Sequence, residues 1–376
     1  MNSIHSLLEQ AINSNASDLL IAAGSRPTLR VDGRLVITDS KAYTREDAEE
    51  AIDAIIDSSI RDYLLEAGPS AIDTSPGDFA ESKMKALRDR EEMDLVFTIA
   101  GLARVRANLF LQRNTFGAAL RIIPIRVQSI EELNLPDILK EWASQPQGLV
   151  IISGPTCSGK STTVAAMIDH INTARECHVV TIEDPVEHVF EDRTSIIHQR
   201  EIGGDTKSYA SALKAVLRQT PDVIVIGEMR DAETLNVAIT AAEVGHLVIS
   251  TLHTTSASAA IDRILNNFPC DVRQQMAVQL SSSLIGVSSQ RLLKKASGLG
   301  RLPALEIMIG SPTVKKLIEE MQLGGLPGAI KEGRHYGMVT INQYLEKLCQ
   351  KKVVAFEEAV LKSPNPTELR QMLRRG

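Results

Sequence analysis

One segment constrains the fold of this chain more than any other, because it fits the phosphate-binding pattern G-x-x-x-x-G-K-[ST] and reads Gly154-Pro155-Thr156-Cys157-Ser158-Gly159-Lys160-Ser161. An apolar, β-rich run at 149–152 precedes this loop, and residues 162–171 are apolar at helical spacing. A strand, a loop and a helix in this order point backbone N–H groups and a helix N-terminus at one spot, which favours a polyphosphate. The sequence therefore predicts a nucleoside triphosphate site.

Within the loop, the residues expected to bind the nucleotide are Gly154, Thr156, Cys157, Ser158, Gly159, Lys160, Ser161 and Thr162. Lys160 would neutralise the β- and γ-phosphates, and Ser161 would ligate Mg²⁺. The chain contains no Asn-Lys-x-Asp segment of the kind that recognises guanine, so the expected ligand is ATP with Mg²⁺.

Composition limits the class of protein. A length of 376 residues exceeds what one hydrophobic core usually organises, so two or more domains are expected. The net charge of −6 and the aromatic content of 3% argue against a nucleic-acid partner. No apolar run is long enough to span a bilayer, so we expect a cytoplasmic protein without direct membrane insertion. Four cysteines without a C-x-x-C pair indicate neither a disulfide framework nor a four-thiolate zinc site.

The pattern of apolar residues divides the chain into two domains. Residues 1–124 alternate short helices and strands and predict a smaller α+β domain, with a charged insertion at about 74–93. Residues 125–147 would form a linker. From 148 to 376 strands and helices alternate, which predicts an α/β domain with a parallel-rich sheet, and the pattern becomes helical from about 270. The strands expected there lie at 148–153, 178–182, 223–227 and 247–252, with a short one at 306–309.

Acidic residues follow two of these strands. The second strand ends in a cluster containing Glu183, Asp184 and Glu187, which beside a triphosphate would hold a metal or orient water. The alternative is a helix N-cap and a solvated loop. The third strand is fully apolar and ends in Gly227-Glu228, which is the place for a residue that acts on the attacking water or on Mg²⁺.

Histidines flank the fourth strand. His253 follows it directly and is placed to donate a hydrogen bond to a γ-phosphate and to report its loss, whereas His246 precedes the strand. Two histidines are more often structural, but the position at a strand end favours sensing. A zinc site is disfavoured because no third ligand has suitable spacing.

Four motifs in this order resemble those of the secretion ATPases, the motors of type II secretion, type IV pili and archaella. They are 154–163, the acidic box from Thr181, the segment 217–231 with Gly227-Glu228-Met229-Arg230-Asp231, and 245–254. The resemblance covers nearly the whole chain. It is most similar to the pilus retraction ATPases of the PilT and PilU type, because the chain lacks the additional N-terminal domain and the tetracysteine zinc module of many assembly and secretion members.

The resemblance implies a homohexameric ring that hydrolyses MgATP, with a PAS-like N-terminal domain and a RecA-like motor domain in each subunit. It implies that Glu183 belongs to the acidic box, that Glu228 polarises water and that His253 belongs to the histidine box. Arg106 and Arg121 of the N-terminal domain would reach the nucleotide. The alternative is that Arg104, Arg106 and Arg113 form only the polar face of a strand.

The implied function is type IV pilus retraction and twitching motility, with pilus assembly or type II secretion as the alternative. The implied partners are an inner-membrane platform protein, which would hold the ring peripherally at the inner membrane, and a paralogous pilus ATPase.

Besides the charged insertion, three departures from the family pattern stand out. Cys157 replaces a glycine in the phosphate-binding loop, where a thiol among N–H groups is open to oxidation. Thr220 replaces an aspartate. Residues 313–320 read TVKKLIEE where retraction motors usually carry AIRNLIRE, so Glu319 reverses one charge and bears on the efficiency or partner of retraction.

Overall fold

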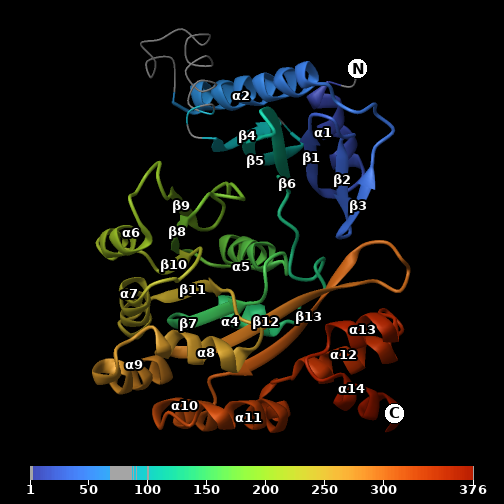
Figure 1. Cartoon of the computed structure of the whole chain (residues 1–376). Coiled ribbons are helices and arrows are strands. Elements are labelled where there is room, and N and C mark those ends of the chain that lie inside the picture. Colours follow the sequence, from blue (N-terminus) through green and yellow to red (C-terminus); the bar gives the residue numbers. More distant parts are fainter. Residues whose placement is uncertain (1–2, 68–86, 88, 90, 100, 376) are drawn as a thin grey trace. The chain divides into compact units, whose positions relative to one another are not determined.

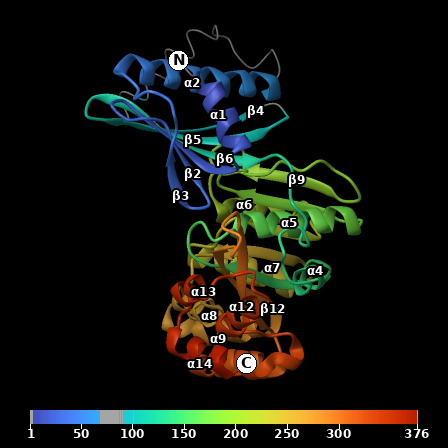
Figure 2. The ribbon, with the colours of Figure 1, turned by 90° about the vertical axis from the view of Figure 1, so that its right-hand side faces the viewer.

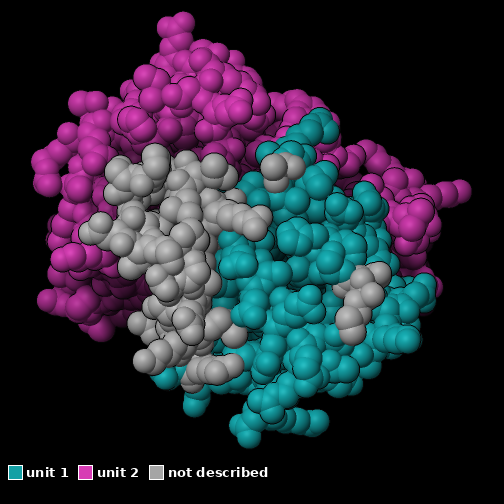
Figure 3. Space-filling view, turned by 90° about the horizontal axis from the view of Figure 1, so that it is seen from above, with its two compact units in different colours: residues 1–126 teal, residues 127–376 magenta. Residues whose placement is uncertain are grey.

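The computed structural model describes residues 3–67, 87, 89, 91–99 and 101–375. The chain divides into two compact units, Met1–Arg126 and Val127–Gly376, which are coloured separately in Figure 3. Most of the charged insertion expected at 74–93 lies outside the described residues. Among the residues described, no helix combines the length and the apolar character needed to cross a membrane.

Unit 1 is built on a six-stranded antiparallel sheet with the order β3-β2-β1-β6-β5-β4. Two helices, α1 (Ile4–Asn13) and α2 (Arg45–Ala67), pack on this sheet (Figures 1 and 2). Strand β5 alternates buried and partly exposed side chains, as in a sheet with one face on the core. Their bounds are β1 (Ala16–Ala22), β2 (Thr28–Val31), β3 (Arg34–Ile37), β4 (Glu92–Ile99), β5 (Ala103–Gln112) and β6 (Thr115–Pro124).

Unit 2 contains a seven-stranded sheet with the order β13-β12-β7-β11-β10-β8-β9, in which only β13 is antiparallel to its neighbour. Every residue of β7, β10 and β11 is buried, which explains why most residues of these strands are apolar. The bounds are β7 (Gly148–Ser153), β8 (His178–Glu183), β9 (Ile196–Glu201), β10 (Val223–Ile226), β11 (Leu247–Leu252), β12 (Leu284–Lys294) and β13 (Arg301–Ile309).

Helices cover both faces of this sheet (Figure 1). One face packs against α4 (Ile138–Ala143) and α5 (Lys160–Ala174). The other packs against α6 (Tyr209–Val216), α7 (Ala232–Glu243), α8 (Ala257–Asn266), α9 (Cys270–Ser283), α10 (Pro312–Glu319) and α11 (Leu326–Glu332). A separate small core forms between β12, β13 and the terminal helices α12 (Ile341–Gln350), α13 (Phe356–Lys362) and α14 (Pro366–Arg375).

The structure corrects the sequence prediction in three places. The region from about 270 is helical in part, but the long strands β12 and β13 interrupt it, and β13 is longer than the strand expected at 306–309. The predicted linker contains α4, whose Leu139 and Trp142 are buried against the sheet. Strand β9 was not predicted because its residues Ile196–Glu201 are mostly polar and lie at the edge of the sheet.

Candidate nucleotide site

The phosphate-binding loop connects β7 to α5 and holds three residues at positive φ. Gly154 has φ +150°, and a Cβ there would lie 2.5 Å from the main-chain oxygen of Gln290, so only glycine fits. Gly159 has φ +88° and immediately precedes α5. Cys157 has φ +61°, a conformation that costs an L-residue free energy, which gives a physical reason why a glycine suits this position.

Lys160 is only 8% exposed at the start of α5. Its Nζ donates to the carbonyl oxygens of Gly154, at 3.0 Å, and Pro155, at 3.1 Å. Burial lowers the pKa of Lys160, and the nearby Glu228 carboxylate opposes that effect. An ammonium held this way at the start of a helix, beside the phosphate-binding loop, is matched to a polyphosphate.

Two serines of the loop offer further hydroxyl groups beside Lys160. Ser161 is exposed in the first turn of α5, where its hydroxyl can ligate a cation. Ser158 Oγ is buried and has no hydrogen-bond partner within the described part of the chain. The donor set of the loop therefore fits a nucleoside triphosphate.

Glu228 and His253 come to the same place from the carboxyl ends of neighbouring strands β10 and β11. His253 Nε2 lies 3.5 Å from Glu228 Oε2, and His253 Nδ1 lies 3.3 Å from Lys160 Nζ. Arg230 Nε donates to the same Glu228 oxygen at 2.8 Å. The sequence prediction placed Lys160, Glu228 and His253 at one site, and the structure brings these three side chains together.

Glu183, the last residue of β8, is held by two donors. Thr181 Oγ1 donates to its Oε1 at 2.6 Å, and Gln199 Nε2 donates to the same oxygen at 3.1 Å. Burial raises the pKa of Glu183 despite these bonds. Strand β9 also fixes the loop that follows, because Glu201 Oε2 accepts from the backbone N–H of Val186. Hydrogen bonds thus hold the Glu183 carboxyl in place, whereas the alternative was a carboxylate on a solvated loop.

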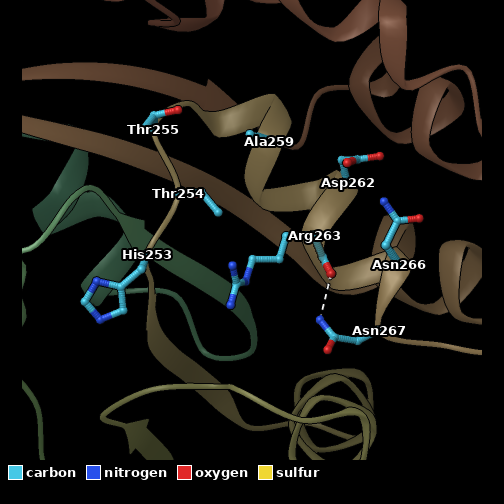
Figure 4. A pocket seen from close by; sticks show the side chains of 8 residues that line it. All are labelled: His253, Thr254, Thr255, Ala259, Asp262, Arg263, Asn266 and Asn267. Carbon is cyan, nitrogen blue, oxygen red and sulfur yellow. Dashed lines mark hydrogen bonds between the residues drawn. The ribbon is translucent and has the colours of Figure 1, made fainter.

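A pocket opens beside His253 within unit 2 (Figure 4). Helix α8 supplies much of its lining, and the guanidinium of Arg263 extends toward the side on which His253 lies. Asn267 Nδ2 donates to the carbonyl oxygen of Arg263 at 2.8 Å. The remaining lining residues are Thr254, Thr255, Ala259, Asp262 and Asn266.

The two arginines predicted to reach the nucleotide belong to unit 1. Arg106 on β5 and Arg121 on β6 are cross-strand partners. Arg121 Nε donates to Asp18 Oδ1 at 3.2 Å, and Arg30 lies 3.4 Å from the other oxygen of the same carboxylate. Within unit 1 these arginines therefore occupy a polar face of the sheet, and their role toward the nucleotide stays a prediction.

Sequence reasoning missed Gln290, which lies on β12 and contacts the phosphate-binding loop through its side chain. The only signal was a polar residue in the run Ser288-Ser289-Gln290, and this run lowered the apparent strand character of the segment.

The model of the type II/IV secretion system protein family matches residues 118–330. The chain belongs to this family. A relative named type IV pilus retractation ATPase PilT, from Pseudomonas aeruginosa, is 39% identical over 96% of this chain and 98% of its own length. A twitching motility protein of Neisseria gonorrhoeae is 43% identical over 76% of each chain.

Among solved structures, this member of the secretion family is similar to the pilus retraction motor PilT with bound ADP. The identity is 38%, the TM-score is 0.80, and the match covers 98% of this chain and 99% of that one. The resemblance to the PilT type is confirmed, and so is the expected fold class of an α/β ATPase domain preceded by a smaller domain. Similarity to an ATPase, and to a structure holding ADP, also supports nucleotide use and ATP hydrolysis by this chain.

Proposed function

We propose that this chain is a motor ATPase that hydrolyses MgATP to power the retraction of a type IV pilus. The convergence of Lys160, Glu228 and His253 beside the phosphate-binding loop carries the proposal, because it joins the groups that phosphoryl transfer to water needs. The similarity to PilT over nearly the whole chain supports retraction as the work performed.

Each residue has a chemical task in this proposal. Lys160 and the loop N–H groups hold the phosphates, and Ser161 would hold Mg²⁺, which supplies charge neutralisation when bound. The Glu228 carboxylate accepts a hydrogen bond from water and orients it for attack. His253 directs its N–H at Glu228 and its other ring nitrogen at Lys160, so it fixes the position of these two side chains relative to each other.

The remaining assignments rest on the resemblance. Arg106 and Arg121 would approach the nucleotide when a subunit closes, which would couple hydrolysis to rigid-body motion. The ring would be a homohexamer that acts on an inner-membrane platform protein from the cytoplasmic side, together with a paralogous ATPase. Glu183 would orient water or the metal from the acidic box.

The test replaces the chromosomal copy with Glu228→Gln, which keeps the side-chain shape and removes the carboxylate. Surface pili and twitching motility are then counted in the same cells. We expect excess pili and no motility, because filaments would be assembled but not withdrawn. Bald cells would contradict retraction and indicate an assembly motor, and normal motility would contradict the role of Glu228.

A further inference from the structure

Gln290 has no role in the proposed function. Its polar side chain is only 2% exposed and lies next to the phosphate-binding loop. We propose that Gln290 is a positioning residue whose carboxamide sets the shape of the phosphate-binding loop from the neighbouring strand. This inference rests on the proposed function, because it concerns the same nucleotide site.

Two hydrogen bonds join this carboxamide to the loop and to the helix that follows. Its Nε2 donates to the carbonyl oxygen of Ser158 at 2.8 Å. Its Oε1 accepts from Thr163 Oγ1, also at 2.8 Å. Both bonds are buried and join residues more than 120 positions apart in the chain. The Gln290 side chain therefore binds both the phosphate-binding loop and the first turn of α5.

The identities of the partners fix the orientation of the amide. A carbonyl oxygen only accepts hydrogen bonds, so the NH₂ group must face Ser158. The amide oxygen then faces Thr163, whose hydroxyl donates. A side chain without a donor at this position would leave the buried Ser158 carbonyl without this bond.

The backbone of Gln290 shapes the loop as well. Strand β12 runs parallel to β7, and Ser289 pairs with Ser153, so Gln290 stands beside the first loop residue. Its main-chain oxygen would lie 2.5 Å from a Cβ at Gly154, and its Nε2 would lie 2.9 Å from a Cβ at Gly159. Both glycines of the motif thus pack on this residue. A side chain at either glycine would collide with Gln290.

The experiment uses the whole 376-residue chain with Gln290→Met, which keeps the length of the side chain and removes both hydrogen bonds. The matched control is Ser288→Ala on the same strand and face, because Ser288 Oγ is buried without a partner among the described residues. The dissociation constant for ADP, and KM and kcat for ATP, are measured for each variant, and circular dichroism reports folding. We expect Gln290→Met to weaken ADP binding and to raise KM by about tenfold or more, while the control stays near wild type.

A second variant distinguishes positioning from packing. Gln290→Glu keeps the shape and the acceptor for Thr163, but it turns a carboxylate oxygen toward the Ser158 carbonyl. A protonated carboxyl can donate to that carbonyl, so nucleotide affinity of this variant should recover as the pH falls, unlike that of wild type.

A merely structural role predicts a different pattern, in which a smaller folded fraction lowers kcat and leaves KM and the ADP affinity unchanged. That result, or an affinity of Gln290→Glu that ignores pH, would overturn the inference. Failure of the wild-type protein to hydrolyse ATP would instead overturn the proposed function, so the two failures are distinguishable.

Discussion

The Nζ atom of Lys160 lies 3.3 Å from Nδ1 of His253, and this contact joins two motifs 93 residues apart in the chain. An ammonium has no acceptor, so Nδ1 accepts and the proton of a neutral His253 sits on Nε2, toward Glu228 at 3.5 Å. Burial lowers the pKa of His253, and the positive charge of Lys160 lowers it further. The histidine is therefore a neutral link between the lysine that binds phosphate and the acid that orients water.

Replacement of His253 should lower the rate of ATP turnover more than it weakens the binding of ATP. We expect His253→Gln to lower kcat for ATP hydrolysis by about a hundredfold and to change KM little, because the loop contacts of Lys160 remain. The control is His246→Gln, since His246 lies at the opposite end of the same strand and its Nδ1 contacts the carbonyl oxygen of Ala241. Equal losses in both variants would contradict a specific role for His253.

The left-handed conformation of Cys157 predicts that glycine is preferred there. Cys157→Gly should raise the free energy of unfolding of the nucleotide-free protein, by up to ~1 kcal/mol. Cys157→Val should lower it, because a β-branched side chain tolerates positive φ poorly. Urea unfolding of the three proteins checks this order. A less stable glycine variant would show that the thiol has contacts that outweigh the backbone strain.

The raised pKa of Glu183 predicts a pH dependence of stability. Between the ordinary glutamate pKa near 4.5 and the raised value, the folded chain binds more protons than the unfolded chain. The contribution of this carboxyl is therefore complete below pH 4.5 and is lost as the pH rises through the raised pKa. Relative to Glu183→Gln, the wild-type free energy of unfolding should fall over that window. A constant difference between the two proteins would contradict the prediction.

The arginines of unit 1 offer a test with an internal control. We expect Arg106→Ala and Arg121→Ala each to lower kcat by about tenfold or more, if they stabilise the charge of phosphoryl transfer. Arg30→Ala should leave kcat near wild type, although Arg30 contacts the same Asp18 carboxylate as Arg121. If the three variants had the same kcat, Arg106 and Arg121 would have no specific role in hydrolysis and would be surface residues of the sheet.

The sequence predicted the strands and the site correctly where an apolar run is followed by polar residues of known chemistry. Strands β7 and β11 have the predicted bounds, because both strands are buried on both faces and are mostly apolar. The loop motif predicted the place of Lys160, and the acid and the histidine follow from the rule that active groups gather at the carboxyl ends of parallel strands.

The sequence was uninformative where buried polar groups find distant partners. Strand β12 contains three buried polar residues, Ser288, Ser289 and Gln290. The hydrogen bond of Gln290 to Ser158 joins this strand to the loop that follows the neighbouring strand β7. A period-two pattern cannot reveal a polar residue that is satisfied by tertiary structure. For the same reason the helical prediction beyond 270 missed β12, and with it the contact of Gln290 with the loop.

In the proposed function the Glu228 carboxylate drives hydrolysis at this site, and the rate of the purified protein tests that role. The rate of ATP hydrolysis with Mg²⁺ is compared for purified wild type, Glu228→Gln and the control Glu233→Gln, whose exposed carboxylate on α7 pairs with Lys214. We predict an active wild type, an active control and a Glu228→Gln rate lower by about a hundredfold or more. A Glu228→Gln protein that hydrolyses ATP at the wild-type rate would show that this carboxylate does not drive hydrolysis.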